Sequence, residues 1–221
     1  MKNTKKIDIP QLYKLKSSDS EQLILIYMNA FEEYPKMMNT FTDKRTRLLA
    51  LEATLRYYTA YDLKYGYGFS LDENVHEAAL LVHSDDMNYT LFKHLRAGSY
   101  SSSYRKVMRK LSKEERKMRI RLFEELDRLE KEMVIPSPHL YVDFLGVEEK
   151  FQHQGRGRKL MTQICSYADD VNLPIMLFTN TEDDVKFYKS LGFHVIGETS
   201  SEKFGFTNTY LVYTPKALKA L

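Results

Sequence analysis

The sequence predicts an α/β fold, and three segments of its second half carry that prediction. His139–Val147 alternates between two faces and is rich in β-branched and aromatic residues, which is typical of a strand. After a short turn, apolar residues recur at helical spacing from Leu160 to Ala168, and Leu177–Asn180 then has the composition of a second strand. Because strands that alternate with helices favour a sheet covered by helices, we expect a central sheet flanked by helices.

The first helix is predicted near the start of the chain. Ser18-x-x-Glu21 has the pattern of a capping box, in which two side chains bind free backbone N–H groups at a helix start. The segment from Leu23 to Tyr34 follows as the helix, and Pro35 is expected to end it.

A second helix and a hairpin are predicted next. The helix runs from Asp43 to about Lys64, with a buried stripe formed by Leu48, Leu51, Leu55 and Tyr58. Gly66–Leu71 and Val75–His83 are expected to pair as a hairpin around Asp72–Asn74.

A long connection, from about Ser84 to Pro138, separates this hairpin from the strand His139–Val147. Gly98–Tyr104 is rich in serine and tyrosine and is expected to be a loop. Ser112-x-x-Glu115 predicts the start of a helix with one apolar side, formed by Met118, Leu122, Leu126, Leu129 and Met133. The connection is therefore an ordered helical insertion.

The segment Gln152–Arg158, called here the glycine turn, joins the strand to the following helix. Gly155 and Gly157 lack a Cβ, so the backbone can turn tightly and present N–H groups to an anion at a helix N-terminus. Four basic side chains surround it: Lys150, Arg156, Arg158 and Lys159. Its glycine spacing differs from that of dinucleotide-binding turns, and no Gly-Lys-Ser/Thr of a P-loop follows. The turn predicts a phosphate-binding site.

The Gln-x-x-Gly-x-Gly pattern of the glycine turn resembles the signature of the GNAT superfamily of acetyl-CoA-dependent N-acetyltransferases. A second block, Asp184–Phe193, is similar to that superfamily's closing helix with its Phe-Tyr-x-x-x-Gly-Phe ending. The resemblance covers about residues 139–198 and implies a central mixed sheet in one domain, residues 1–221, with the helical insertion at about 84–138. Phe31–Pro35 also resembles the first helix of the puromycin-type branch.

Composition excludes several classes of protein. The 221 residues are 43% apolar, which suffices for a sizeable core. The net charge is +3, and although Arg105–Met133 has 11 basic against 7 acidic residues, a nucleic-acid binder would show a stronger basic face. No apolar run has transmembrane length and no signal-type stretch follows Met1, so we expect a cytoplasmic protein without membrane contact. Cys165 is expected to be a core thiol, and no cluster has metal-ligand spacing.

The resemblance implies roles for particular residues. Tyr188 occupies the place of the general acid, and a phenol with a reference pKa of about 10 can protonate a departing thiolate with a reference pKa of about 8.5. Asp143, expected to share a strand face with Tyr141, Leu145 and Val147, would accept a proton from the acceptor or bind its ammonium; structural hydrogen bonding is the alternative. Expected cofactor-binding residues are Leu145, Gly146, Val147, Gln152, His153, Gln154, Gly155, Arg156, Gly157, Arg158, Asn180 and Tyr188, and expected acceptor-binding residues are Phe31, Tyr34 and Tyr141.

These observations predict an enzyme that transfers acetyl from acetyl-CoA, as donor co-substrate, to the primary amine of a small molecule by direct attack in a ternary complex. The insertion would form one wall of the acceptor pocket; padding of the sheet edge is the alternative. A protein lysine or N-terminal acetyltransferase and a non-catalytic acyl-CoA-responsive protein also remain open. The oligomeric state, with a homodimer as one alternative, is open as well.

Overall fold

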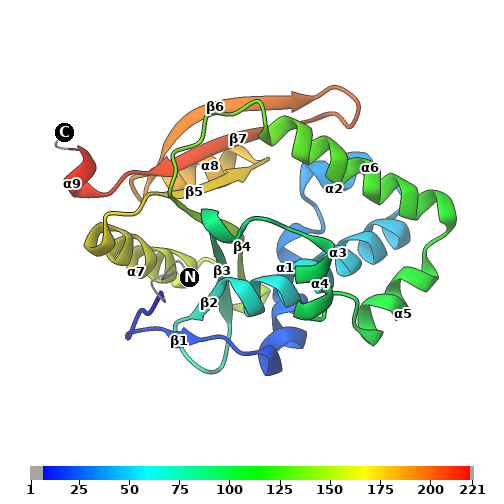
Figure 1. The fold of residues 1–221 in the computed structure, drawn as a ribbon, viewed down its shortest axis with the longest axis horizontal. Coiled ribbons are helices and arrows are strands. Elements are labelled where there is room, and N and C mark those ends of the chain that lie inside the picture. Colours follow the sequence, from blue (N-terminus) through cyan, green and yellow to red (C-terminus); the bar gives the residue numbers. More distant parts are fainter. Residues whose placement is uncertain (1–6, 220–221) are drawn as a thin grey trace.

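The computed structural model describes residues 7–219, and within them a mixed seven-stranded sheet lies at the centre (Figure 1). The strand order is β1-β2-β3-β4-β5-β7-β6. All neighbouring strands are antiparallel except β4 and β5, which are parallel. The strands are β1 (Tyr13–Lys14), β2 (Tyr67–Ser70), β3 (Glu77–His83), β4 (Leu140–Val147), β5 (Ile175–Thr179), β6 (His194–Ser201) and β7 (Phe206–Tyr213).

Helices cover both faces of this sheet, so the predicted α/β fold is confirmed. The first half of the chain contains α1 (Ser20–Phe31), α2 (Pro35–Thr40), α3 (Lys44–Tyr65), α4 (Leu91–Ala97), α5 (Ser102–Lys110) and α6 (Lys113–Glu130). The second half contains α7 (Arg156–Val171), α8 (Glu182–Lys189) and α9 (Lys216–Lys219). Short 3₁₀ turns lie at Ser17–Asp19, Ser84–Asp86 and Glu149–Phe151. No helix of residues 7–219 is long and apolar enough to cross a membrane.

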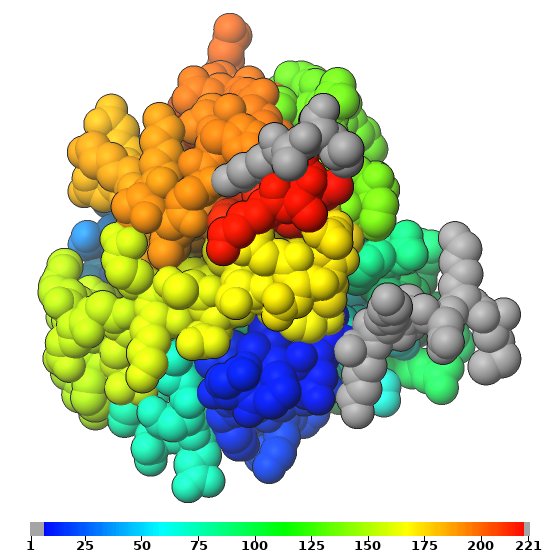
Figure 2. Space-filling model, turned by 90° about the vertical axis from the view of Figure 1, so that its left-hand side faces the viewer, coloured from blue at the N-terminus to red at the C-terminus, as the bar shows by residue number. Residues whose placement is uncertain are grey.

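One face of the sheet packs against α7 and α8. Its core joins sheet residues such as Leu81, Leu140 and Leu177 to Leu160 and Ile164 of α7. The first described residues also contribute, because Ile7, Ile9 and Leu12 belong to the same cluster. Figure 2 shows this face, with the N-terminal segment in blue lying beside α7 in yellow and yellow-green.

The opposite face packs against α1, α3 and α6. Leu80 of β3, Leu23 of α1, Leu55 of α3 and Leu129 of α6 are all fully buried in this second cluster. Both faces of β3 are therefore apolar, which is typical of a central strand between two layers of helices.

Both predicted boundaries of the first helix were wrong. Ser18 and Glu21 form no capping box, because the helix begins at Ser20 and Glu21 instead pairs with Arg56 of α3. The helix also ends at Phe31, before Pro35. Pro35 opens α2, since proline lacks the N–H that a first helical residue leaves unused.

The insertion is confirmed as ordered and helical, with two corrections. The serine-tyrosine segment is a loop only up to Ser101, whose side chain caps α5, so Tyr104 lies in a helix. The capping box at Ser112 and Glu115 is present, but α6 ends at Glu130 and Met133 lies beyond it. The two ends of the insertion meet, because the His139 N–H donates to Ser84 Oγ and the Ser84 N–H donates to the His139 carbonyl.

Strand β4 carries an irregularity that decides where its side chains point. In the register with β3, Leu81 pairs with Val142 and Leu80 with Phe144, so Asp143 is an extra, bulged residue. The expected common face of Tyr141, Asp143, Leu145 and Val147 was therefore wrong. Leu145 packs on the α7 side of the sheet, and Val147 lies on that side beneath Gly157.

Candidate active site

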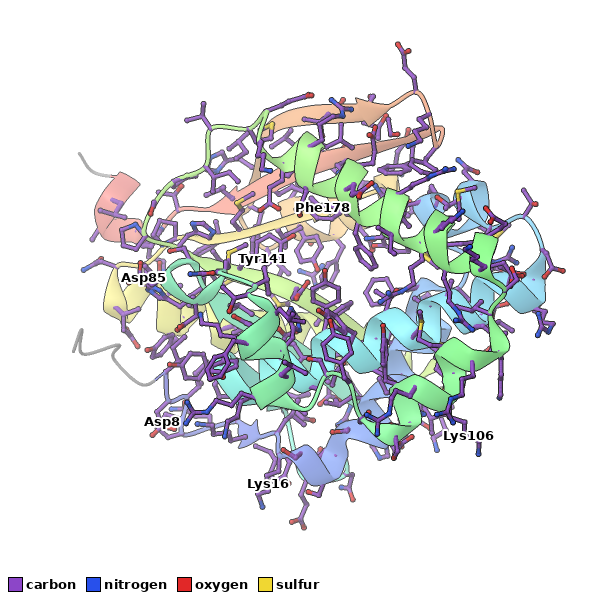
Figure 3. The ribbon with its side chains drawn as sticks, turned by 45° about the vertical axis from the view of Figure 1, so that its right-hand side comes forward. Asp8, Lys16, Asp85, Lys106, Tyr141 and Phe178 are labelled. Carbon is purple, nitrogen blue, oxygen red and sulfur yellow. The ribbon has the colours of Figure 1, made fainter. Side chains whose placement is uncertain are left out.

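A cavity of about 630 Å³ runs along the sheet between the two layers of helices. Its floor is β4 and β5, and its other walls come from α1, α2, α3, α6, α7 and α8. Figure 3 shows Tyr141 of β4 and Phe178 of β5 in the interior, on the side of the sheet that α6 faces. The insertion therefore does line the cavity, while Leu122 and Leu129 of α6 also complete the core.

The floor of the cavity opens because β4 and β5 separate. Their parallel pairing is limited to Leu140 with Ile175 and Tyr141 with Met176. Beyond Tyr141, β4 pairs only with β3. The β5-facing backbone groups of β4 from the bulge onward therefore have no strand partner within residues 7–219, and they lie beside the cavity. An extended ligand with amide groups could bind there as an added strand.

The glycine turn lies at one end of this cavity, at the N-terminus of α7. Gly155 has a φ of +77°, a left-handed conformation that favours glycine, and a Cβ there would point into open space. The first amide to bond within the helix is that of Lys159, which donates to the Gly155 carbonyl. The amides of Arg156, Gly157 and Arg158 therefore have no intrahelical acceptor and can bind an anion.

Two residues of the glycine turn are used differently from our expectation. The Gln152 N–H donates to the Glu149 carbonyl and its side-chain amide donates to the Val147 carbonyl at 3.1 Å, so its donors hold the turn against β4. The Arg156 guanidinium pairs with buried Glu77 and with Asp72, 2.8 Å away. In this arrangement the side-chain amide of Gln152 is used within the turn, and the side-chain charge of Arg156 is paired with carboxylates.

Arg158 keeps its positive charge available. Its guanidinium donates to Ser190 Oγ at 2.7 Å and lies over the ring of Phe187, but it forms no ion pair within residues 7–219. It lines the cavity beside the helix N-terminus. The helix N-terminus and Arg158 together form an electropositive end.

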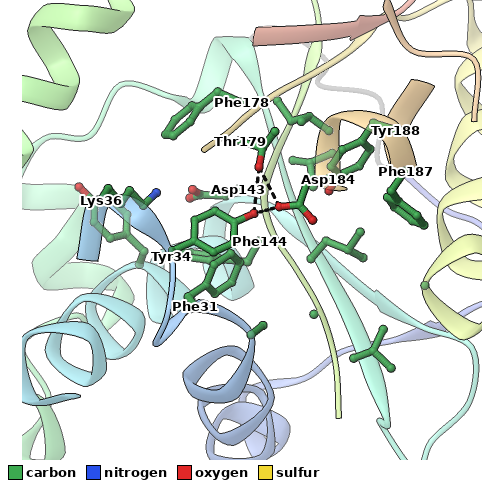
Figure 4. A pocket seen from close by; sticks show the side chains of 18 of the residues that line it. Phe31, Tyr34, Lys36, Asp143, Phe144, Phe178, Thr179, Asp184, Phe187 and Tyr188 are labelled. Atoms are coloured by element: carbon green, nitrogen blue, oxygen red, sulfur yellow. Dashed lines mark hydrogen bonds between the residues drawn. The ribbon is translucent and has the colours of Figure 1, made fainter. Parts of the chain in front are cut away.

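A hydrogen-bond network joins the two sides of the cavity near its middle. The Tyr34 hydroxyl lies 3.0 Å from Thr179 Oγ1 of β5 and donates to the Asp184 carboxylate of α8 (Figure 4). Thr179 also donates to Asp184 at 2.8 Å. Burial, followed by the charge of Asp184, raises the pKa of Tyr34 far above its usual range. Tyr34 therefore holds its proton and ties the start of α2 to the edge of the gap.

Asp143 and Lys36 point toward one another across the cavity (Figure 4). Burial raises the pKa of Asp143 to about 6, although a hydrogen bond with Asp62 and the positive charge of Lys36 act in the opposite direction. Burial lowers the pKa of Lys36 to about 8, against the effect of Asp143. Lys36 also lies over the ring of Phe178, 4.8 Å from its centroid. Two groups that titrate near neutral pH thus face each other beside the bulge.

Tyr188 lines the same cavity from α8. Its ring packs between Phe187 and Phe193, with centroid distances of 5.1 and 5.3 Å. Its hydroxyl forms no hydrogen bond with any residue that the structure describes. Burial, with the neighbouring Tyr34 and Asp184, raises its pKa well above the usual value, so the hydroxyl stays protonated.

The structure brings together most of the residues expected at the site. Phe31, Tyr34, Tyr141, Asp143, Tyr188, Leu145 to Val147 and most of the glycine turn line the one cavity. Gln154 and Asn180 do not. Asn180 follows β5 and donates to the Thr207 carbonyl and to Asn208, both at 2.7 Å, so it joins β5 to β7.

Other cavity residues were missed by the sequence reasoning. They are Lys36, Tyr58, Tyr89, Phe123, Asp127, Glu130, Phe178, Thr179 and Asp184, together with Asp62 behind the cavity wall. A signal for Asp62 did exist, because it follows Leu51, Leu55 and Tyr58 at helical spacing. A carboxylate that continues a buried stripe of a helix is rarely a solvated residue.

Metal and thiol chemistry find no support in the described part of the chain. No group of three or more histidine, cysteine or acidic residues could hold a metal ion in residues 7–219. Cys165 of α7 is buried in the core, as expected.

The comparisons with known proteins agree with this geometry. Residues 108–195 match the family model described as the acetyltransferase (GNAT) domain. The match covers less than half of the chain, so the similarity to this superfamily concerns residues 108–195. Members of this superfamily use acetyl-CoA, and the match includes β4, the glycine turn, α7 and α8. No curated protein sequence matches the chain.

Solved structures of proteins described as acetyltransferases share its fold. A Corynebacterium glutamicum protein described as histone acetyltransferase HPA2 and related acetyltransferase has a TM-score of 0.59 at 14% identity, over 94% of this chain and 97% of that one. Arylalkylamine N-acetyltransferase 2 from Aedes aegypti has a TM-score of 0.57 at 12% identity, over 92% of this chain and 97% of that one. At these identities the likeness concerns the fold alone.

Proposed function

We propose that this chain is a GNAT enzyme that transfers acetyl from acetyl-CoA to the primary amine of a small molecule, by direct attack in a ternary complex. The observation that carries the proposal is the single cavity that runs from the glycine turn, along the gap between β4 and β5, to a chamber between β4, α2 and α6. One end suits an anionic donor, and the other end suits a cationic acceptor.

The donor end fits acetyl-CoA in three respects. The free amides at the start of α7 and the charge of Arg158 would bind the pyrophosphate. The unpaired edge of β4 offers N–H and carbonyl groups to the amides of the pantetheine arm. The bulge at Asp143 ends this path, so the thioester would lie beside Asp143, where backbone N–H groups can stabilise the charge that develops on its oxygen.

The acceptor end fits an amine with an apolar or aromatic body. Its wall contains Tyr58, Tyr89, Phe123 and Phe178, whose ring faces attract cations. Three carboxyl groups, those of Asp127, Glu130 and Asp143, line this end of the cavity. Lys36 is the one lysine among the lining residues of the described chain. Asp127 and Glu130 form no salt bridge with any residue from 7 to 219. This excess of negative charge favours a positively charged acceptor.

A small acceptor is favoured over a protein chain because α6 and α2 wall the chamber on the side opposite the sheet. The Phe31–Pro35 segment, which resembles the puromycin-type branch, places Phe31 and Tyr34 in that wall. This supports a bulky aromatic amine as the acceptor. A protein lysine would have to enter between these helices.

The test is thiol release from acetyl-CoA by the purified chain with a panel of acceptors. Small primary amines with aromatic bodies should release thiol at rates that saturate with amine, while lysine-containing peptides and intact proteins should not. Direct binding of acetyl-CoA is measured in parallel. Tight acetyl-CoA binding with no accepted amine would support a binding protein, and transfer only to protein substrates would overturn the small-molecule assignment.

A further inference from the structure

A buried carboxyl without a usual partner lies behind the cavity wall. Asp62 of α3 is 0% exposed, and neither of its carboxyl oxygens accepts a hydrogen bond from an N–H or hydroxyl group of residues 7–219. Oδ2 of Asp143 and the hydroxyl of Tyr27 are buried with no partner in the same part of the chain. An ionised carboxylate is strongly disfavoured in such a place, so Asp62 must be neutral.

A neutral carboxyl carries a proton that it can donate, and Asp143 is the acceptor that faces it. Burial raises the pKa of Asp62 well above its usual value, and both the charge of Asp143 and a hydrogen bond with Asp143 act in the same direction. That hydrogen bond lowers the pKa of Asp143, whose own carboxyl lines the cavity. Two carboxylates could not form this bond, because neither would have a proton to donate.

We infer that Asp62 and Asp143 form a carboxyl pair that shares one proton, in which Asp62 positions Asp143 to accept the proton of the acceptor's ammonium group. The inference rests on the proposed function for its catalytic part. Asp62 is a positioning residue, because it lies behind Asp143 and does not line the cavity. Asp143 is the group that would touch the acceptor.

The proton balance of the step is complete. The ionised Asp143 takes one proton from the ammonium, and the neutral amine then forms a C–N bond to the acetyl carbonyl carbon as the C–S bond breaks. The leaving thiolate gains a proton from the Tyr188 hydroxyl. The nitrogen loses a second proton as it becomes an amide nitrogen, and this proton restores the Tyr188 hydroxyl. The pair retains the first proton until solvent takes it.

Several elements place titratable or charged groups around the pair. Tyr27 (α1), Lys36 (α2), Tyr58 (α3), Tyr89 (after the 3₁₀ turn Ser84–Asp86), Glu130 (α6) and Tyr141 (β4) each interact electrostatically with Asp143. The tyrosines stay protonated because burial raises the pKa of each. Lys36 favours an ionised Asp143, and an arriving ammonium would do the same.

The first test needs no substrate. Carbon-13 NMR of the full chain, with labelled aspartate carboxyls, should show at neutral pH a protonated carboxyl that is absent from Asp62→Asn. A second carboxyl, absent from Asp143→Asn, should titrate well above the ordinary aspartate range. If both carboxyls titrate independently at ordinary aspartate values, the shared proton is wrong, whatever the enzyme's activity.

The second test separates positioning from a merely structural role. Asp62→Asn keeps an N–H donor for Asp143, so the acidic limb of the pH profile of kcat/KM should stay near that of wild type. In Asp62→Leu the new side chain has a volume similar to that of aspartate but no hydrogen-bond donor. Asp143 should then titrate at higher pH, and the acidic limb of the kcat/KM profile should move to higher pH. At neutral pH, kcat should fall roughly ten- to a hundredfold, as expected when a charged group loses a hydrogen bond.

A positioning role and a merely structural role of Asp62 predict opposite changes in the melting temperature of Asp62→Leu. Asp62→Leu replaces a buried carboxyl by an apolar side chain, so its melting temperature should rise although its activity falls. A structural role predicts a lower melting temperature with a kcat that is reduced only through unfolding. Glu52→Gln, on the solvent side of the same helix, is the matched control and should change neither the pH profile nor the NMR titration. An unshifted acidic limb in a folded Asp62→Leu would overturn the inference.

If acetyl-CoA binds but no amine is accepted, the proposed function fails while the carboxyl titration still decides whether the pair exists. If amines are accepted and the titration shows no shared proton, the inference fails and the proposed function stands. The two failures are therefore distinguishable.

Discussion

The raised pKa of Asp143 is connected with the position of this residue in the backbone. As the bulged residue of β4 it is displaced from the alternation of the strand, and its carboxyl enters the cavity between Lys36 and Asp62. Removal from water raises its pKa, while the two neighbours restrain that rise. A carboxyl that titrates near pH 6 can take a proton from an amine more effectively than one with an ordinary pKa near 3.9.

Lys36 should therefore influence the pH dependence of the reaction. Asp143 must be ionised to act, so kcat/KM should rise as pH increases through about 6, its pKa in the folded protein. Lys36→Met removes the positive charge that lowers this pKa, so the acidic limb should move to higher pH. Lys36→Arg keeps the charge and should leave the limb nearly in place. Identical limbs in Lys36→Met and wild type would show that the two groups are not coupled.

Tyr188 is predicted to protonate the departing thiolate. Tyr188→Phe keeps the ring that packs against Phe187 and Phe193 but removes the hydroxyl. Positioned acid catalysis contributes about 10²–10⁴-fold, so turnover should fall by at least about a hundredfold with little change in acetyl-CoA affinity. Single-turnover measurements of thiol release at saturating acetyl-CoA check this without interference from product release. Near-normal single-turnover rates would assign the tyrosine to packing only.

At the scale of elements, the N-terminus of α7 presents its amides to the cavity only because Gly155 adopts a left-handed conformation. Gly155→Val should distort this turn, since a non-glycine residue there costs about 1–2 kcal/mol and a β-branched one more. If that strain moves the amides, acetyl-CoA affinity should fall more than about tenfold, which corresponds to about 1.4 kcal/mol. Isothermal titration calorimetry measures the affinity directly.

The matched control for this change is Gly98→Val. Gly98 ends α4 with a φ of +81° and also has no neighbour within 4 Å of an added Cβ, so the backbone strain is comparable. It lies outside the cavity, and acetyl-CoA affinity should be retained. Equal affinities in the two folded variants would disprove the phosphate role of the glycine turn.

The helix α6 is predicted to set the size of the acceptor that fits. Leu126 faces the cavity, so Leu126→Trp should narrow the chamber and raise the KM for the amine several-fold or more, with the Kd for acetyl-CoA unchanged. Ile120→Trp, on the exposed side of the same helix, should change neither constant. A normal amine KM in Leu126→Trp would mean that the acceptor binds elsewhere.

For the whole molecule, local patterns and long-range contacts differ in what the sequence can reveal. The glycine turn, the hairpin at Asp72–Asn74 and the capping box at Ser112 were predicted, because each depends on residues a few positions apart. The bulge at Asp143 was not, because it depends on the register between β3 and β4. The wrong assignment of Leu145 and Val147 to the face of Asp143 follows from that one residue.

The charge pairs of the site could not be predicted from the sequence either. The sequence placed four basic residues around the glycine turn, but only the fold brings Arg156 to Glu77 and Asp72, which occupy its guanidinium. Similarly, only the fold brings Asp62 of α3 close enough to interact with Asp143 of β4. Pairs that are distant in sequence are invisible to periodicity and spacing.

The two ends of the cavity also imply how the whole molecule works. In the proposed function, the donor path along β4 and the acceptor chamber beneath α6 meet at the bulge, so both substrates would be present together and no acetylated side chain would be required. Initial rates of thiol release, measured while both acetyl-CoA and the accepted amine are varied, test this claim most directly. The account predicts double-reciprocal lines that intersect, as for a ternary complex, whereas parallel lines would reveal a covalent acetyl-enzyme and contradict direct transfer.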